Sequence, residues 1–215
     1  MKAFIFDLDG VIVFTDKFHY QAWKTTADSI GVYFDETINN RLRGVSRAES
    51  LEIILERHTG ILSADEKANL MEEKNNIYRK LLDTMKPADV SDEVRSVLNK
   101  LRQMGFKLAI GSSSKNTVFI LEKVQLRGAF DAISDGNNIT RSKPDPEVFL
   151  KAASFLGEKP QDCVVIEDAV AGIDAAKAAG MITVGIGDAA SYKKSDYTIR
   201  SFAELLDIEL FKEPK

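Results

Sequence analysis

Short apolar runs alternate with helical patterns along the second half of the chain, and this alternation constrains the fold most. The runs FKLAIG, FDAIS, CVVIE and ITVGIG are predicted strands. Between them, apolar residues recur at helical spacing over 94–104, 119–126, 148–156, 171–180 and 202–211, the last with Ser201 and Glu204 as its caps. Strands joined by single helices pair in parallel with right-handed crossovers. We therefore predict an α/β fold with a doubly wound, Rossmann-like parallel sheet, in which the run FIF (4–6) is a central strand.

Residues 15–86 show helical patterns and no strand pattern. Apolar residues recur at helical spacing from Phe18 to Ile30, and Gly31 ends that pattern. Ser-x-x-Glu capping boxes at 46–49 and 63–66 predict two more helix starts, and Pro87 interrupts the last helix. We predict an α/β core of residues 1–14 and 87–215 with an all-helical insert of 15–86, joined by short linkers that act as a hinge.

Polar residues follow several predicted strands at the point where each strand ends. Ligands of an open parallel sheet bind beyond the carboxyl ends of its strands. The residues that this rule brings to one edge are Asp7 and Asp9 after FIF, Ser112, Ser113 and Ser114 after FKLAIG, Lys143 in the loop after FDAIS, and Glu167 and Asp168 after CVVI.

Each of these residues alone also has a purely structural interpretation. Asp9-Gly10 is typical of a turn, Glu167 and Asp168 of the first turn of a helix, the serines of a helix cap, and Lys143 of a solvated loop. Their convergence from different strands favours a functional site.

Clustered carboxylates supply the oxygen ligands that Mg²⁺ prefers, and such sites commonly leave room for a substrate phosphate. A serine hydroxyl and a lysine ammonium suit the remaining oxygens of a phosphoryl group. The predicted reaction is phosphoryl transfer, with one aspartate as nucleophile and the other as acid and base. The chain contains no Walker A motif.

Composition excludes several other classes. The formal net charge of −4 comes without a basic stripe, which argues against a nucleic-acid partner. No apolar run is long enough to span a bilayer, and the first apolar run meets Asp7 at once, so we expect neither a membrane association nor a signal peptide. We expect a cytoplasmic monomer whose single cysteine, Cys163, is a buried apolar residue. The Gly185-x-Gly187-x-x-Ala190 spacing is only a weak dinucleotide signal, because the segment after it is a poor helix.

Several motifs of the sequence resemble those of a known family. DLDG, a serine after FKLAIG, a lysine before PDP and the segment EDAVAGIDAAKAAGM are similar to the four motifs of the haloacid dehalogenase superfamily, over essentially the whole chain. HYQAW, RLRGVSRAES, SSSKN and SKPDPEVF resemble, within it, the β-phosphoglucomutase family, whose helical cap corresponds to residues 15–86.

The resemblance implies a Mg²⁺-dependent mutase that interconverts β-glucose 1-phosphate and glucose 6-phosphate through a bisphosphate. It implies that Asp7 is the phosphorylated nucleophile, Asp9 the acid and base, and Ser112 and Lys143 the holders of the transferring phosphoryl group. Asp7, Asp9, Glu167 and Asp168 would form the metal site. The substrate, a sugar phosphate, would contact Thr15, His19, Trp23, Gly44, Val45, Arg47, Lys74, Ser113, Ser114, Lys115 and Asn116, among which Arg47, Ser114, Lys115 and Asn116 grip the second phosphate.

Three positions depart from the family pattern. Phe14 stands where the family usually has an acid, Arg43 where it often has a lysine, and Ala169 where it often has a serine. The first two affect the hinge and the sugar-facing loop, and they leave the sugar preference open.

Two other functions compete with a mutase. A phosphatase of small sugar phosphates would use the same aspartyl phosphate but needs no grip on a second phosphate. A signalling module that accepts phosphate on an aspartate, like a receiver domain, needs neither that grip nor residues 15–86.

Overall fold

The computed structural model describes residues 1–43 and 45–209 and contains a single six-stranded parallel sheet within them. The strand order is β3-β2-β1-β4-β5-β6, so the chain winds outward in both directions from β1. This confirms the predicted doubly wound α/β fold. The strands are β1 (Ala3–Phe6), β2 (Lys107–Gly111), β3 (Ala132–Ser134), β4 (Cys163–Glu167), β5 (Ile182–Gly185) and β6 (Tyr197–Thr198).

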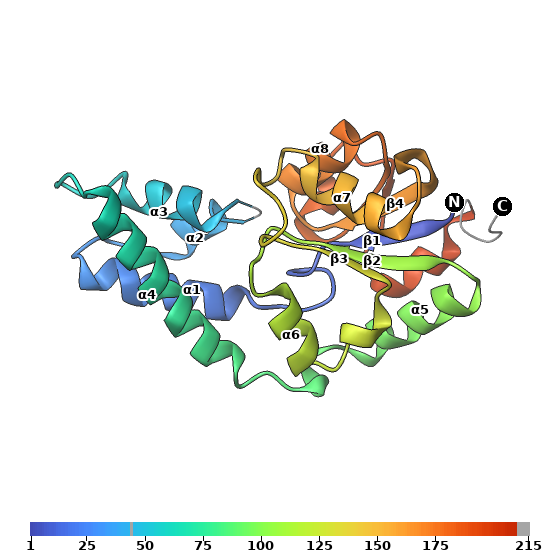
Figure 1. The fold of residues 1–215 in the computed structure, drawn as a ribbon, viewed down its shortest axis with the longest axis horizontal. Helices are drawn as coiled ribbons and strands as arrows, with labels where there is room; N and C mark the ends of the chain where they lie inside the picture. The colour runs from blue at the N-terminus through green and yellow to red at the C-terminus, as the bar shows by residue number, and fades with distance from the viewer. Residues whose placement is uncertain (44, 210–215) are drawn as a thin grey trace.

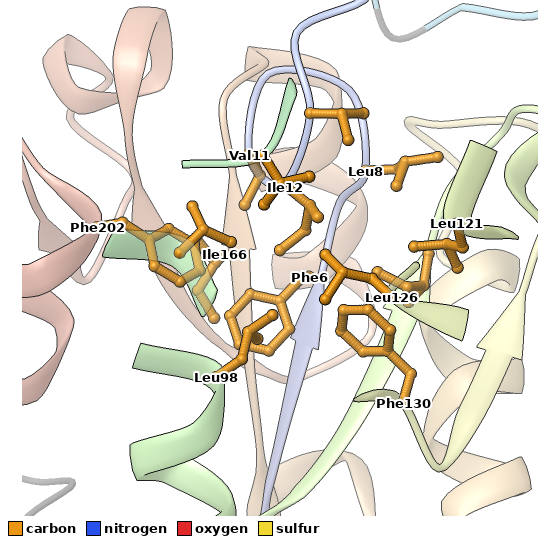
Figure 2. Close-up of a cluster of buried hydrophobic side chains, with 14 of the residues drawn as sticks. Phe6, Leu8, Val11, Ile12, Leu98, Leu121, Leu126, Phe130, Ile166 and Phe202 are labelled. Atoms are coloured by element: carbon orange, nitrogen blue, oxygen red, sulfur yellow. The ribbon is translucent and has the colours of Figure 1, made fainter. Parts of the chain in front are cut away.

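Strand β1 is buried on both faces, and its alternating side chains divide the core in two. Phe4 and Phe6 pack into the cluster beneath the face covered by α5 (Asp92–Gln103) and α6 (Thr117–Lys123). Ala3 and Ile5 pack against α7 (Glu147–Leu156) and α8 (Val170–Ala178) on the other face. Figure 2 shows the first cluster, in which the Phe6 ring lies 6.2 Å from that of Phe130 and 5.7 Å from that of Phe202, centroid to centroid. An apolar run without alternating polarity is what a strand covered on both faces requires.

The helices of the core lie on the two faces of the sheet, with α7 and α8 on one face and α5 and α6 on the other (Figure 1). Besides α5 and α6, the core contains α7 (Glu147–Leu156), α8 (Val170–Ala178) and the 3₁₀ helices η1 (Pro87–Asp89), η2 (Arg127–Ala129), η3 (Pro160–Asp162), η4 (Gly187–Ser191) and η5 (Phe202–Asp207). No described helix is both long and apolar enough to pass through a bilayer.

The described part of the cap contains four helices on one side of the core, all beyond the carboxyl ends of the strands (Figure 1). They are α1 (Asp16–Ser29), α2 (Glu36–Asn40), α3 (Arg47–Leu55) and α4 (Ala64–Leu82). The capping boxes at the starts of α3 and α4 form as predicted: each serine accepts from the backbone N–H of the glutamate three residues on, and each glutamate accepts from the serine N–H. The short α2, capped by Asp35, was not predicted.

The cap has a hydrophobic core of its own, built around Trp23, Phe34, Leu51 and Ile54. It is also joined to the main core, because Ala22, Tyr78 and other residues of α1 and α4 pack into the same cluster as Phe6. We propose the boundaries 1–14 and 87–215 for the core and 15–86 for the cap, with the chain crossing between them at 14–16 and 85–88.

The end of the described chain differs from the prediction. The segment from Phe202 to Asp207 is a 3₁₀ helix rather than an α-helix, and the Ser201 side chain makes no capping hydrogen bond. Glu204 instead accepts from the backbone N–H of Arg200 at 2.9 Å. The remainder of the predicted helix, 210–211, lies outside the described residues. The Gly185-x-Gly187 segment leads into the 3₁₀ helix η4, not into the α-helix that a dinucleotide site needs.

Candidate active site

The DLDG segment turns sharply at the end of β1. The backbone N–H of Asp7 still donates to the Ile166 carbonyl at 3.0 Å, so Asp7 leaves the sheet at a fixed place. Gly10 has a φ of +90°, and a Cβ there would lie 2.0 Å from Asp168 Oδ2. Only a glycine at position 10 therefore allows Asp168, which follows β4, to come this close to the turn after β1.

Lys143 is buried between the carboxylates of β1 and β4. Its Nζ lies 2.5 Å from Asp7 Oδ1 and also pairs with Glu167 Oε1. Burial alone would lower the pKa of Lys143, but the attraction of Asp7 and Glu167 outweighs it and the pKa is raised. The pKa of Asp7 is raised, because burial and the charges of Glu167, Asp168 and Asp9 outweigh the effect of Lys143. The ammonium is thus firmly cationic in this cluster.

Asp9 has a different environment from Asp7. Burial raises the pKa of Asp9 to about 6, although a hydrogen bond from the Thr15 hydroxyl opposes the shift. Thr15 stands at the N-cap of α1 but makes no capping bond with its side chain, since that hydroxyl donates to Asp9 Oδ1 instead. A carboxyl group that titrates near 6 can both give and take a proton near neutral pH.

The serine loop after β2 presents hydroxyl groups toward the same place. Ser112 Oγ accepts from the Ser114 N–H at 3.1 Å, and Ser114 Oγ accepts from the Asn116 N–H at 3.2 Å, which fixes the loop and leaves each O–H free to donate. Ser113 Oγ is buried and has no hydrogen-bond partner among the described residues. A buried hydroxyl without a partner is costly, and an anionic ligand would satisfy it.

Two cations of the cap face this edge of the core. Lys74 is 2% exposed; its Nζ lies 3.0 Å from His19 Nδ1 and above the rings of Trp23 and Tyr78. Burial and the charge of Arg47 lower the pKa of Lys74 to about 7, and burial lowers that of Arg47. Neither cation forms an ion pair with a described carboxylate. This arrangement favours an anion bound between cap and core.

These groups line one cavity of about 620 Å³ between cap and core. The volume suits a small phosphorylated ligand. Of the residues predicted from the sequence, the cavity is lined by Asp7, Asp9, His19, Trp23, Val45, Arg47, Lys74, Ser112, Ser113, Ser114, Lys115, Asn116, Lys143, Glu167 and Asp168. Thr15 lies behind Asp9 rather than in the lining, and Gly44 is outside the described residues.

The acidic residues fit a hard divalent cation by their chemistry. Burial and the charges of its neighbours, Glu167 first among them, raise the pKa of Asp168 to about 7, and a bound cation would relieve this repulsion. Glu167 packs so closely on α8 that a Cβ at Gly172 would lie 1.8 Å from its Oε1. In residues 1–43 and 45–209 no three His, Cys, Asp or Glu side chains are already arranged as metal ligands. Lys143 instead pairs with Asp7 and Glu167.

Several contacts of the site were not predicted from the sequence. Asn75 accepts from both Arg47 and Asn116, which joins the cap to the core. Arg43, from the loop before α3, pairs with Asp16 and, at 2.6 Å, with Asp188 of the core. Tyr78, one helical turn after Lys74, stacks on His19 with ring centroids 4.1 Å apart. The i, i+4 spacing of Lys74 and Tyr78 is the one signal that the sequence carried, because it places both on one face of α4.

Comparison with known proteins finds relatives that match most of the chain. The family model described as haloacid dehalogenase-like hydrolase matches residues 1–180. A β-phosphoglucomutase of Bacillus subtilis strain 168 is 42% identical, over 99% of this chain and 95% of its own. A phosphorylated carbohydrates phosphatase of Thermotoga maritima is 32% identical, over 84% of this chain and 82% of its own. The crystal structure of a β-phosphoglucomutase from Clostridium difficile has a TM-score of 0.89 and 39% identity, covering 95% of this chain and 93% of that one.

Proposed function

The chain belongs to the haloacid dehalogenase-like hydrolase family, and we propose that within this family it is a Mg²⁺-dependent phosphomutase acting on β-glucose 1-phosphate and glucose 6-phosphate. Members of the family generally depend on Mg²⁺. A mutase must hold two phosphates at once, one on each side of the sugar. The observation that carries the proposal is the second set of cations, Arg47 and Lys74, which faces the catalytic edge without a carboxylate partner in the described chain.

The proposed chemistry begins at Asp7. Its carboxylate attacks a phosphoryl group of the bisphosphate, forms an aspartyl phosphate, and releases a sugar monophosphate. Lys143, held beside Asp7, neutralises charge on the transferring oxygens, and the hydroxyl of Ser112 donates to them. Mg²⁺, held by Asp7, Asp9, Glu167 and Asp168, would supply further neutralisation of that charge.

Asp9 moves the proton of the sugar oxygen. It protonates the oxygen that leaves as the aspartyl phosphate forms, and it accepts the proton of the hydroxyl that attacks the aspartyl phosphate in the second step. Its pKa of about 6 and the hydrogen bond from Thr15, which fixes the orientation of the carboxyl group, support this role. His19 and Lys74 lie beside this centre on the cap, where they would contact the sugar phosphate.

Closure of the cap decides between transfer to sugar and transfer to water. While the cap covers Asp7, water is kept from the aspartyl phosphate and a sugar hydroxyl is the available acceptor. The reaction must turn the bisphosphate over before release, so that either phosphate can face Asp7. The cavity of about 620 Å³ is large enough for the ligand to bind in both orientations.

A phosphatase of small sugar phosphates is the second candidate, because the relatives include such enzymes. Incubation with β-glucose 1-phosphate, Mg²⁺ and a trace of glucose 1,6-bisphosphate separates the two. We expect glucose 6-phosphate with little free phosphate. Free phosphate without glucose 6-phosphate would falsify the mutase proposal, and a long-lived phosphoenzyme indifferent to sugar would support a signalling module instead.

A further inference from the structure

The side chain of Asn75, on α4, joins three elements through one oxygen atom. Asn75 Oδ1 accepts from Arg47 Nη2 at 2.7 Å and from Asn116 Nδ2 at 3.0 Å. Arg47 begins α3 of the cap, whereas Asn116 stands before α6 of the core. A guanidinium group can only donate, so the amide oxygen of Asn75, not its nitrogen, must face it. The bridge between cap and core therefore consists of one shared acceptor, which in this chain is neutral.

The two donors on Asn75, Arg47 and Asn116, belong to the set that the family resemblance implies grips the second phosphate. A phosphate oxygen makes the same kind of contact as Asn75 Oδ1, but the hydrogen bonds that it accepts are charge-assisted and about twice as strong. We infer that Asn75 is a positioning residue: it holds Arg47 and Asn116 together in the free enzyme, and it yields both donors to the distal phosphate of the substrate. This inference rests on the proposed function.

The chemical nature of the Asn75 side chain matters for this exchange. Burial lowers the pKa of Arg47, and its guanidinium forms no ion pair among the described residues, so it remains available to an anion. A carboxylate at position 75 would hold Arg47 with its own charge and would also repel the phosphate. An apolar side chain would leave both donors to water. The amide lies between these cases, because it orders the donors without neutralising them.

Three variants separate this role from simple helix packing. Asn75→Ala removes the acceptor, Asn75→Asp keeps an acceptor and adds a charge, and Asn76→Ala changes the next, exposed residue of α4, which lies outside the main cavity. The affinity of each Mg²⁺-loaded enzyme for glucose 6-phosphate is measured by titration calorimetry, together with kcat, KM and the unfolding temperature without sugar phosphate.

For Asn75→Ala we expect the Kd for glucose 6-phosphate and the KM to rise about tenfold, with kcat changed by less than about threefold. For Asn75→Asp we expect a larger loss of affinity, but an unfolding temperature at least equal to that of the parent, because the new carboxylate pairs with Arg47. Asn76→Ala should match the parent in every measurement. Since Asn75→Asp retains the bridge, it keeps the experiment informative if the alanine variant folds poorly.

Two results would overturn the inference. One is parent-like affinity in Asn75→Ala; the other is an equal fall of affinity and of unfolding temperature in Asn75→Ala and Asn75→Asp, which would indicate a packing role. Failure of the proposed function looks different, because a parent enzyme that makes no glucose 6-phosphate refutes the mutase whatever the variants do. A parent that isomerises the sugar phosphate, with Asn75→Ala unaffected, refutes this inference alone.

Discussion

At the scale of single residues, Asp7 and Asp9 lie at one strand end but differ in their partners. Asp7 is paired with the ammonium of Lys143, which works toward the ionised carboxylate and opposes the rise in pKa that burial and the neighbouring carboxylates cause. Asp9 accepts from the neutral hydroxyl of Thr15 and titrates near 6. The two carboxyl groups are therefore suited to different steps, one to attack phosphorus and the other to carry a proton.

We expect Asp7→Asn to form no phosphoenzyme, because an amide is not a nucleophile toward phosphate. Asp9→Asn should still accept a phosphoryl group slowly, but should lose about 10²- to 10⁴-fold in turnover, since an amide cannot carry the proton. Intact mass after incubation with glucose 1,6-bisphosphate and Mg²⁺ detects the phosphoenzyme. Asp65→Asn, at the exposed start of α4, is the control. Parent-like turnover in either active-site variant would contradict the assignment.

Lys74 is a buried cation whose position is unfavourable for stability. Its pKa is about 7 in the folded protein and 10.5 when exposed, so between these pH values the unfolded chain binds a proton that the folded one does not. Stability then rises with pH through that window, and the full penalty is present at pH 7 and below.

Lys74→Met should therefore raise the free energy of unfolding by about 2 kcal/mol at pH 6, and this gain over the parent should shrink as the pH approaches 10. Urea unfolding at pH 6, 8 and 10, without sugar phosphate, measures it. Lys80→Met, exposed on the same helix, should show no such trend. A stability gain in Lys74→Met that stays constant with pH would contradict this explanation. The activity of Lys74→Met should fall, because the proposed anion site loses a cation.

At the scale of elements, the loop before α3 is tied to the core by an ion pair at the rim of the cavity. Arg43 joins Asp16 at the start of α1 to Asp188 in η4, and all three side chains are partly exposed. The planar fork of arginine can reach two carboxylates at once, whereas a lysine offers a single point charge. This gives a physical account of the departure from the family pattern at position 43. Phe14, 69% exposed, has no explanation in the structure.

We expect Asp188→Ala to increase the free phosphate released per sugar phosphate isomerised by about two- to fivefold, because a looser cap admits water to the aspartyl phosphate. Asp188 itself does not line the cavity, so the variant removes no side chain from the lining. Raising the salt concentration should also increase the free phosphate released per sugar phosphate isomerised by the parent, because salt screens an exposed ion pair. The same change should affect Asp188→Ala much less. Lys193→Ala, in the following loop, is the control. An unchanged ratio of free phosphate to isomerised sugar phosphate in Asp188→Ala would show that the Arg43–Asp188 pair does not hold the cap closed.

The elements themselves were largely predictable, because their signals are local. Five of the strands and both capping boxes follow from apolar runs and Ser-x-x-Glu spacing. The two-residue β6 carries too little pattern to detect, and the segment at Phe202 has helical spacing but forms a 3₁₀ helix in which Ser201 makes no cap. Spacing alone does not distinguish i+3 from i+4 hydrogen bonding over so short a segment.

The convergence of the site was predictable from topology, but its bridges were not. The rule for carboxyl ends of parallel strands brings Asp7, Lys143 and Glu167 together. The contacts of Asn75 depend instead on how the cap sits on the core, and no local pattern in α4 encodes that. The roles of the site residues and the metal ligand set remain predictions.

At the scale of the whole molecule, the ligand site belongs to neither unit alone. Asp7, Lys143 and Ser112 come from the core, while Arg47, Lys74 and His19 come from the cap, and both sets line one cavity. In Figure 1 the cap helices lie beyond the carboxyl ends of the core strands. The hydrophobic cluster around Phe6 extends into α1 and α4, so the ends of the cap helices nearest the core share its packing. Movement of the cap relative to the core must therefore rearrange this shared packing.

The central place of β1 also has a consequence during synthesis. This strand is synthesised before the other strands of the sheet, and its neighbours, β2 and β4, begin only at Lys107 and Cys163. At a synthesis rate of roughly 5–20 residues per second, Phe4 and Phe6 remain without their neighbouring strands for on the order of ten seconds or more. The cap helices, which pack around Trp23 within a short stretch of chain, can form meanwhile. During that interval the apolar strand has no sheet partners, and we expect chaperone binding or aggregation of the nascent chain to begin there.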